Sequence, residues 1–268
     1  MATAPEDQTH YLQLSGLRIR VRVFNSGKPG LPLLCFNGVG ASMELLQPFV
    51  DEVRNTTVII YDVPGTGESD APGYPWRPRR HARLAVEVLR SLGFSQVNVL
   101  GISWGGMLAQ EFARQYPDIC KGLVLAATSA GQLMVPARPR VLLRMSNPLR
   151  YLIPSYMEAI AGDIYGGSLR TDKLQVREHF RHMKPPSIKG YFYQVLSLLG
   201  WSSLPWLHTL QQRTLVLAGD DDPIVPLINA RMLTAKIPRA KLRVVDCGHL
   251  FLLTRASILA PEIEQFLA

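Results

Sequence analysis

The sequence predicts an α/β fold in which a mostly parallel, doubly wound sheet carries a helical segment inserted near the middle of the chain. Apolar runs of strand length alternate with helical patterns in both halves of the sequence. This alternation stops between about residues 131 and 210, where the pattern becomes helical and proline-rich. The 268 residues are 47% hydrophobic and 19% charged, which suits a globular protein with a sizeable core.

The strand patterns define the predicted sheet. Residues 11–24 predict two strands around the turn Ser15-Gly16, and the alternation in 18–24 is typical of a half-exposed edge strand. Later apolar runs are continuous and end in turns, which indicates strands buried on both faces, as in a parallel sheet. These runs occupy residues 32–38, 57–67, 97–102, 122–128, 214–220 and 241–248.

Helical patterns separate many of these strands, at residues 43–54, 79–93, 107–117, 227–237 and 256–268. We therefore predict a core domain of residues 1–130 and 211–268, with a helical cap formed by residues 131–210. A segment of about eighty residues without a clear parallel strand is too long for an ordinary crossover. The alternative is a set of extra helices that pack on the sheet and have no role in substrate access.

The net charge of +8 is spread along the chain, and no run reaches the five like charges of a nucleic-acid-binding tail. We therefore expect no nucleic-acid partner. The positive charge is explained by a need for solubility, by attraction to an anionic surface, or by affinity for an acidic product. We find no signal-peptide pattern and no transmembrane segment. Three widely spaced cysteines fit neither a disulfide framework nor a zinc site, so we expect buried thiols in a cytoplasmic protein.

Residues Gly101-Ile102-Ser103-Trp104-Gly105 match the pattern G-x-S-x-G between a predicted strand and a predicted helix. A serine at such a sharp turn takes a strained backbone conformation, and glycine two residues away on each side removes a Cβ atom that would collide. The amino end of the following helix carries partial positive charge, which stabilises an anion formed there. The pattern predicts that Ser103 is a catalytic nucleophile.

A serine nucleophile needs a base, and His249 follows the last predicted strand at its carboxyl end. We expect the other histidines to lie on the surface or in the cap: His10, His81, His179, His182 and His208. His179 and His182 are spaced as metal ligands on a helix could be, but no third ligand is evident. We therefore expect no metal and no organic cofactor.

The base in turn needs an acid, and three successive aspartates follow the predicted strand 214–219. We choose Asp222 by its position shortly after that strand and just before Pro223, and keep Asp220 and Asp221 as alternatives that otherwise form the turn or cap the next helix. Asp246 is closer to the histidine in sequence, but strand direction is expected to point it elsewhere. The chain order Ser103, Asp222, His249 is that of α/β-hydrolases.

The oxyanion of an acyl-transfer intermediate needs two hydrogen-bond donors. We predict that these are the backbone N–H groups of Trp104 and Val39. Val39 lies in the loop after the apolar run Leu33–Phe36, where many hydrolases have His-Gly and this chain has Asn37-Gly38. Because the backbone donates, this departure is not expected to matter.

Several motifs together resemble the bacterial intracellular medium-chain-length polyhydroxyalkanoate depolymerases, over nearly the whole chain from about Tyr11 to Leu267. The more particular ones are AATSAG with MVP, IYGG and GHLFLLTRA, beside the shared stretches VNVLGISWGGMLAQEFA and TLVLAGDDDPIVP. The resemblance implies an ester hydrolase that acts on stored granules of 3-hydroxy fatty acid polyester. It carries the triad over to Ser103, Asp222 and His249, and implies a cytoplasmic, granule-associated protein.

Other functions share these residues. A soluble esterase, lipase or thioesterase would have the same triad, as would a carbon–carbon bond hydrolase of aromatic degradation. A non-catalytic binding or granule-coat protein would not need to keep serine, aspartate and histidine together. The apolar cap sequences at residues 142–157 and 191–208 are either ordinary core or, in part, a substrate channel or a patch that docks on a granule.

Overall fold

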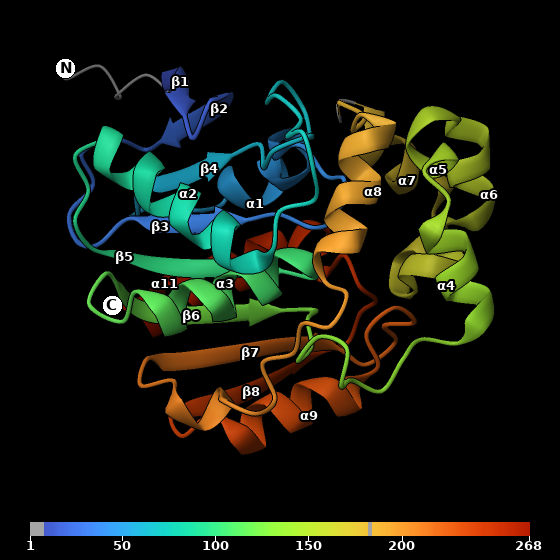
Figure 1. Ribbon diagram of the computed structural model, residues 1–268. Helices are drawn as coiled ribbons and strands as arrows, with labels where there is room; N and C mark the ends of the chain where they lie inside the picture. The colour runs from blue at the N-terminus through green and yellow to red at the C-terminus, as the bar shows by residue number, and fades with distance from the viewer. Residues whose placement is uncertain (1–7, 182–183) are drawn as a thin grey trace, which may run out of the picture.

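The computed structural model describes residues 8–181 and 184–268, which form an eight-stranded sheet with helices on both faces (Figure 1). The strand order is β1-β2-β4-β3-β5-β6-β7-β8. Strands β3 to β8 run parallel to one another, whereas β2 is antiparallel to both of its neighbours. The strands are β1 (Gln8–Leu14), β2 (Leu17–Phe24), β3 (Leu33–Phe36), β4 (Val58–Tyr61), β5 (Val97–Ile102), β6 (Cys120–Ala126), β7 (Arg213–Gly219) and β8 (Ala240–Val245).

The prediction that residues 18–24 form an edge strand is wrong. Strand β2 pairs with β1 on one side and β4 on the other, so β1 forms this edge of the sheet. Arg20 of β2 is only 5% exposed, because it forms ion pairs with Asp62 at 2.7 Å and Glu44 at 2.8 Å. The polar alternation thus includes one buried, paired arginine, so it does not identify an edge strand.

Helices cover both faces of the sheet (Figure 1). One hydrophobic cluster lies between the sheet and α2 (Pro78–Ser91), α3 (Trp104–Gln115) and α9 (Leu227–Lys236). A second cluster on the other face includes α1 (Gln47–Val50), α10 (Phe251–Thr254) and α11 (Ala256–Leu267). Two faces covered in this way explain why the central strands read as continuous apolar runs.

The helix expected over residues 43–54 is shorter than predicted. A 3-10 turn, η1 (Met43–Leu46), leads into the four-residue α1, and Val53 then bonds back to Val50 three residues earlier. Leu46, Phe49 and Val53 are nevertheless all buried in the core. The apolar spacing therefore marked the buried face correctly, although the tight turns replace most of the α-helix.

Residues 131–210, which we call the insertion, leave the sheet after β6 and return before β7. An isolated antiparallel bridge pairs Gly131 with Ser202 and ties the two ends together. The helices α4 to α8 gather beyond the end toward which β6 points (Figure 1). The elements are α4 (Pro139–Ser146), α5 (Leu149–Leu152), α6 (Pro154–Tyr165), η2 (Gly167–Arg170), α7 (Lys173–Arg181), α8 (Ile188–Ser197) and η3 (Leu207–Thr209). Among the described residues, no helix is both long and apolar enough to cross a membrane.

Candidate active site

The three candidate catalytic residues follow three parallel strands at the same edge of the sheet. Ser103 directly follows β5, Asp222 lies in the loop after β7, and His249 lies in the loop after β8. Because these strands are parallel, their carboxyl ends meet at one edge, which is where ligands bind in open α/β sheets. The insertion covers this same edge (Figure 1).

Ser103 occupies a strained turn, with φ 54° and ψ −118°. Such a conformation costs a non-glycine residue about 1–3 kcal/mol and persists only where surrounding contacts impose it. Strand β6 and the loop after it supply those contacts: the Ser103 N–H donates to the Ala126 carbonyl at 2.9 Å, and the Thr128 hydroxyl donates to the Ser103 carbonyl at 2.6 Å. The backbone of the turn at Ser103 is therefore held through both its N–H and its carbonyl group.

Both glycines of the motif are required by close packing around this turn. A Cβ atom on Gly101 would lie 2.5 Å from the Gly105 carbonyl oxygen and 2.6 Å from the Ala109 Cβ of helix α3. A Cβ on Gly105 would lie 2.2 Å from the Phe36 carbonyl oxygen at the end of β3. The missing side chains therefore let α3 approach β3 and β5 closely.

His249 and Asp222 form a buried pair, with the His249 Nδ1 2.7 Å from the Asp222 Oδ2. The other carboxylate oxygen accepts the N–H groups of Ile224 at 2.8 Å and Val225 at 2.9 Å, which fixes its orientation. This contact favours the tautomer with the proton on Nδ1, leaving Nε2 to act as a base. In the described part of the chain no hydrogen bond joins Ser103 Oγ to this ring, and such bonds often form only when substrate binds.

The remaining aspartates have other partners. Asp220 accepts the Cys247 N–H at 3.0 Å. Asp221 binds both Nε and Nη2 of Arg170 at 2.7 Å, and hydrogen bonds from this guanidinium hold the pKa of the Asp221 carboxyl below its usual range. Asp246 is exposed. Of the aspartates considered, the structure therefore brings Asp222 to the histidine.

The two predicted oxyanion donors belong to segments that adjoin Ser103. Trp104 is the first residue of α3, and Val39 lies in the loop after β3. Within residues 8–181 and 184–268, neither backbone N–H has a hydrogen-bond acceptor. A Cβ atom added to Gly38 would lie 3.8 Å from the Ser103 Cβ, so this loop lies directly beside the serine. Both groups are thus free to bind a ligand oxygen.

The Asn37 side chain stabilises this loop. Its Oδ1 accepts the Gly38 N–H at 2.9 Å, and its Nδ2 donates to the Ser42 carbonyl at 2.8 Å. Asparagine in place of the usual histidine therefore keeps the turn in shape through its own amide group.

The insertion contributes three residues that sequence reasoning did not assign to the site. The ring of Tyr165 stacks on His249 with 6.3 Å between centroids, and its carbonyl accepts the His249 N–H at 2.6 Å. The Tyr151 hydroxyl donates to the Val39 carbonyl at 2.6 Å. Gln194 Oε1 accepts the Gly40 N–H at 2.8 Å. Only Tyr165 carried a signal in the sequence, as part of the IYGG motif.

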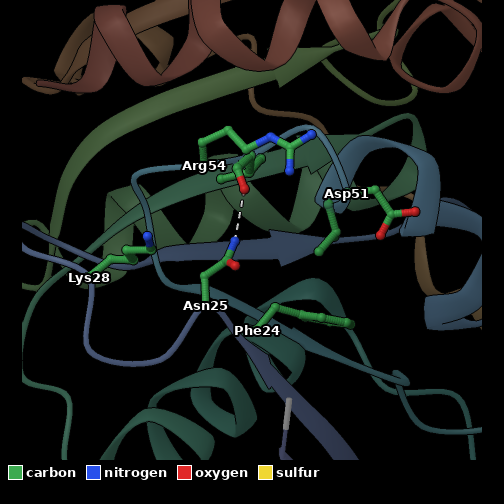
Figure 2. Close-up of a pocket in the computed structure, with 7 residues that line it drawn as sticks. Phe24, Asn25, Lys28, Asp51 and Arg54 are labelled. Carbon is green, nitrogen blue, oxygen red and sulfur yellow. Dashed lines mark hydrogen bonds between the residues drawn. The ribbon is translucent and has the colours of Figure 1, made fainter. Parts of the chain in front are cut away.

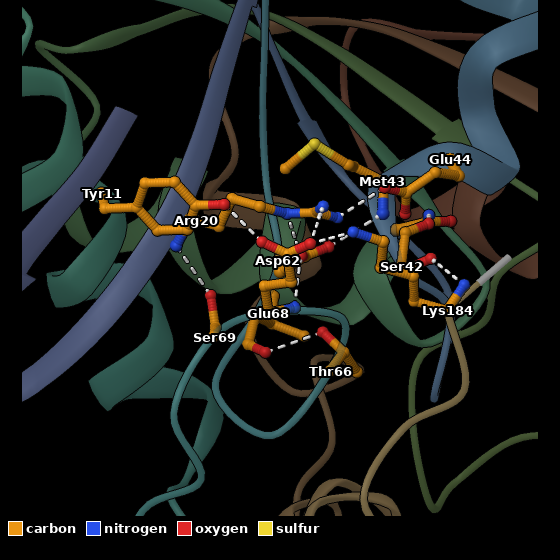
Figure 3. Close-up of polar contacts among 12 residues, drawn as sticks. Tyr11, Arg20, Ser42, Met43, Glu44, Asp62, Thr66, Glu68, Ser69 and Lys184 are labelled. Atoms are coloured by element: carbon orange, nitrogen blue, oxygen red, sulfur yellow. Dashed lines mark hydrogen bonds and ion pairs between the residues drawn. The ribbon is translucent and has the colours of Figure 1, made fainter. Parts of the chain in front are cut away.

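An ion-pair network built around the buried pair Arg20–Asp62 joins loops at the carboxyl ends of β3 and β4 (Figure 3). The Asp62 carboxylate accepts hydrogen bonds from the Arg20 Nε at 2.7 Å, the Met43 N–H at 2.9 Å and the Glu68 N–H at 3.0 Å. Lys184, beyond α7, pairs with Glu68 in turn. The network therefore joins the segments after β3 and β4 to the insertion, and loss of one partner of the buried Arg20–Asp62 pair would be costly.

A polar pocket of about 530 Å³ lies away from these residues (Figure 2). Its lining includes Phe24, which pairs with Val58 at the start of β4, and Asn25, which donates to the Val53 carbonyl at 2.9 Å. This pocket is therefore at the amino edge of the parallel strands, opposite the candidate site. None of the candidate site residues lines it.

The prediction that His81 lies on the surface or in the cap is wrong. It is 2% exposed and packs between the rings of Trp76 and Trp104, with centroids 5.8 Å and 5.3 Å away. Burial lowers the pKa of this imidazole to about 3, so it is neutral at pH 7. Because Trp104 follows Ser103 directly, His81 belongs to the packing around this turn.

The remaining histidines and the three cysteines lie in different environments. His208 is exposed and His10 is half-buried on the edge strand. His182 and the side chain of His179 lie outside the described residues, so the expectation for this pair stays a prediction. Cys35, Cys120 and Cys247 are buried and unpaired, as predicted.

Similarity to known proteins agrees with this geometry. A family described as alpha/beta hydrolase fold matches residues 32–256. The chain is 50% identical over 258 residues to a poly(3-hydroxyalkanoate) depolymerase of Ectopseudomonas oleovorans, covering 96% of this chain and 91% of that protein. It is 31% identical over 213 residues to a 2-hydroxy-6-oxononadienedioate/2-hydroxy-6-oxononatrienedioate hydrolase of Comamonas testosteroni, covering 76% and 73%.

Solved structures show the same fold. The enol-lactonase from Burkholderia xenovorans LB400 superposes with a TM-score of 0.80 at 20% sequence identity, over 96% of this chain and 99% of that one. At this identity the likeness concerns the fold alone.

Proposed function

The chain belongs to the α/β-hydrolase family and, within it, to the poly(3-hydroxyalkanoate) depolymerase family, and from this premise we propose that it cleaves ester bonds of medium-chain-length polyhydroxyalkanoate through an acyl-enzyme. The observation that carries the proposal is the buried His249–Asp222 pair, 2.7 Å apart, at the same sheet edge as the strained Ser103. The 50% identity over 96% of the chain supports the polyester as substrate.

Acylation begins when His249 Nε2 takes the proton of Ser103 Oγ as the oxygen attacks an ester carbonyl. Asp222, held by two backbone N–H groups, stabilises the imidazolium that forms. The N–H groups of Trp104 and Val39 bind the negative oxygen of the tetrahedral intermediate, because neither is engaged elsewhere in the described chain.

The intermediate collapses when its carbon–oxygen bond to the leaving 3-hydroxyl group breaks, and His249 returns the proton to that oxygen. Water then enters, gives a proton to His249 and attacks the acyl carbon. Release of Ser103 frees the 3-hydroxyalkanoate end as a carboxylic acid. The reaction needs no metal and no organic cofactor.

We place the action of the protein at the surface of a cytoplasmic polyester granule. Most of the exposed large apolar side chains in the described part of the chain belong to the insertion, among them Leu143 at 74% and Ile188 at 56% exposure. In the rest of the described chain, the exposed large apolar side chains are Tyr11, Tyr74, Ile228 and Ile258. An apolar surface beside the site suits contact with a hydrophobic granule.

The test is clearing of a medium-chain-length polyhydroxyalkanoate latex, measured beside hydrolysis of a soluble octanoate ester. We expect both activities in the wild-type protein and neither in Ser103→Ala. Ser15→Ala is the matched control, because Ser15 has a similar φ of 49° but lies in the β1–β2 turn. Clearing that persists in Ser103→Ala contradicts the proposal.

A carbon–carbon bond hydrolase is the second candidate, favoured by the 31% identity to the Comamonas testosteroni hydrolase. Turnover of a 2-hydroxy-6-oxo dienoic acid, without ester hydrolysis or latex clearing, would replace the first proposal with this one. Ester hydrolysis without clearing would instead keep the triad and assign a soluble ester as substrate.

A further inference from the structure

Arg150 of α5 is a buried cation that lacks a carboxylate partner. It is 2% exposed, and its Nη1 donates to the Tyr165 hydroxyl at 2.7 Å while Nη2 lies 3.5 Å from the Tyr191 hydroxyl. Its guanidinium carbon lies 4.1 Å from the centre of the Tyr151 ring. Among the described residues, no aspartate or glutamate forms an ion pair with it. Its charge therefore faces neutral phenols and aromatic rings.

A charge buried in this way is costly unless it is paired. Phenol hydroxyls and ring faces compensate only partly, because a guanidinium carries five N–H donors and binds carboxylates best through two parallel hydrogen bonds. Arg150 Nε is buried and has no hydrogen-bond acceptor. The arginine thus retains unused capacity for an anion.

A pocket of about 310 Å³ adjoins this arginine, a volume near the lower end of the range for small-molecule sites. Met157, Val176 and Phe180 give it apolar walls. Its charged lining consists of three arginines and a single glutamate, and that glutamate is already held by Arg177 at 2.7 Å and 2.9 Å. The three arginines are Arg150, Arg177 and Arg181, and the glutamate is Glu158. Tyr151 and Pro154 complete the lining.

We propose that this pocket binds a medium-chain aliphatic carboxylate, with the carboxylate on Arg150 and the alkyl chain against Met157, Val176 and Phe180. The requirement for an anion and an apolar tail follows from the lining, whereas the chain length rests on the proposed function. Two sources share this chemistry: the free acid that hydrolysis releases, and the carboxylate terminus of a polyester chain.

Tyr165 connects the pocket to the catalytic histidine. Its hydroxyl accepts the Arg150 hydrogen bond, and its ring stacks between Phe180, with centroids 5.6 Å apart, and His249, with centroids 6.3 Å apart. Tyr151, which also lines the pocket, holds the Val39 carbonyl. A carboxylate bound here therefore alters the packing of both the base and the oxyanion loop, and we expect it to change ester hydrolysis.

Binding is tested by calorimetry on the Ser103→Ala protein, with octanoate and octanamide as probes. We expect octanoate to bind at least about tenfold more tightly than octanamide, because a carboxylate accepts stronger, charge-assisted hydrogen bonds from a guanidinium than a neutral amide does. Arg150→Met should remove this preference. Arg140→Met is the matched control, because the Arg140 side chain is 71% exposed in the same insertion.

Equal affinity for the two probes, no binding of octanoate, or an unchanged preference in a folded Arg150→Met protein would each overturn the proposal. Should Arg150→Met fail to fold, equal binding of octanoate and octanamide by the Ser103→Ala protein would still overturn the proposal. Arg150→Lys then tests the residue itself, because it keeps the charge but loses the two parallel hydrogen bonds, and octanoate affinity should fall.

Two kinetic arms distinguish the sources of the carboxylate. Inhibition of ester hydrolysis by free 3-hydroxyoctanoate, lost in Arg150→Met, assigns the pocket to the product. A higher kcat/KM for hydroxyoctanoate oligomers with a free carboxyl end than for their methyl esters, also lost in Arg150→Met, assigns it to the chain terminus. A protein that binds octanoate but does not clear latex would contradict the polyester substrate, whereas the proposed carboxylate pocket would still be supported.

Discussion

The indole Nε1 of Trp104 donates a hydrogen bond to the main-chain carbonyl of Gln194, 3.0 Å away. Trp104 begins α3 next to Ser103, whereas Gln194 belongs to α8 of the insertion. The Gln194 side chain also accepts the Gly40 N–H, one residue from Val39. A single residue of the insertion therefore touches the two segments that supply the predicted oxyanion donors.

Replacing Gln194 with leucine should lower kcat more than it raises KM. The variant loses the acceptor for Gly40, and a displacement of about 1 Å in a catalytic group can cost on the order of 100-fold in rate. Steady-state hydrolysis of an octanoate ester measures the effect. Gln132→Leu is the matched control, because Gln132 also accepts a backbone N–H, that of Gly200 at 2.7 Å. Equal loss in both variants would indicate general destabilisation of the insertion.

Asp222→Asn should reduce kcat by about 10,000-fold, because an amide no longer selects the Nδ1-protonated tautomer of His249 or stabilises its cation. The matched variant Asp221→Asn should keep kcat, since Asp221 binds Arg170 and not the histidine. Both side chains of that pair are nearly half exposed, so its loss should cost less than about 1 kcal/mol of stability. A larger fall of kcat in Asp221→Asn would contradict the choice of acid.

Gly105→Ala should destabilise the fold, because the new Cβ would lie 2.2 Å from the Phe36 carbonyl oxygen and 2.4 Å from that of Asn37. Overpacking of this kind costs about 1–3 kcal/mol or more. Urea denaturation measures the difference. Gly73→Ala is the control, since a Cβ there meets nothing within 4 Å and its φ is not in the left-handed region. Equal stability of the two variants would contradict the close approach of α3 to β3.

His81 should make the free energy of unfolding depend on pH. Its folded pKa, lowered by burial to about 3, lies below the value of about 6.5 expected in the unfolded chain. The unfolded state therefore binds more protons between these values, and stability falls by about 1.4 kcal/mol per pH unit as the pH is lowered through this window. The contribution is fully present above about pH 6.5.

Denaturation at several pH values between 4 and 7 tests this prediction. His81→Phe should flatten the dependence in this range, whereas His208→Gln, at an exposed position, should leave it unchanged. An unaltered slope in His81→Phe would show that other groups cause the pH dependence.

Leu143→Asp should weaken latex clearing while leaving hydrolysis of a soluble octanoate ester intact. Leu143 of α4 is 74% exposed, so its replacement with a charge should disturb granule contact but not the fold. Ile258→Asp is the matched control, because Ile258 is 53% exposed on α11, away from the insertion. Equal clearing by the two variants would contradict the proposed docking surface.

Much of the site could be predicted because its signals are local. Gly101 and Gly105 mark the turn around Ser103, and short loops after strands mark Asp222 and His249. The carboxyl ends of parallel strands meet at one edge of the sheet. These residues could therefore be expected at that edge even without knowledge of the strand order. The choice among three neighbouring aspartates also followed from position, and the structure brings the chosen one to His249.

The sequence by itself determined the α/β class, most strands and helices, and the candidate nucleophile, base and acid, because periodicity and turn glycines act over a few residues. Only the tertiary structure decided that Arg20 and His81 are buried, and that Tyr151, Tyr165 and Gln194 of the insertion contact the site. Those contacts join residues far apart in the chain, such as Gly40 and Gln194. Long-range packing of this kind leaves no local pattern, and it also places Arg150, which has no carboxylate partner among the described residues, in contact with the tyrosine that stacks on His249.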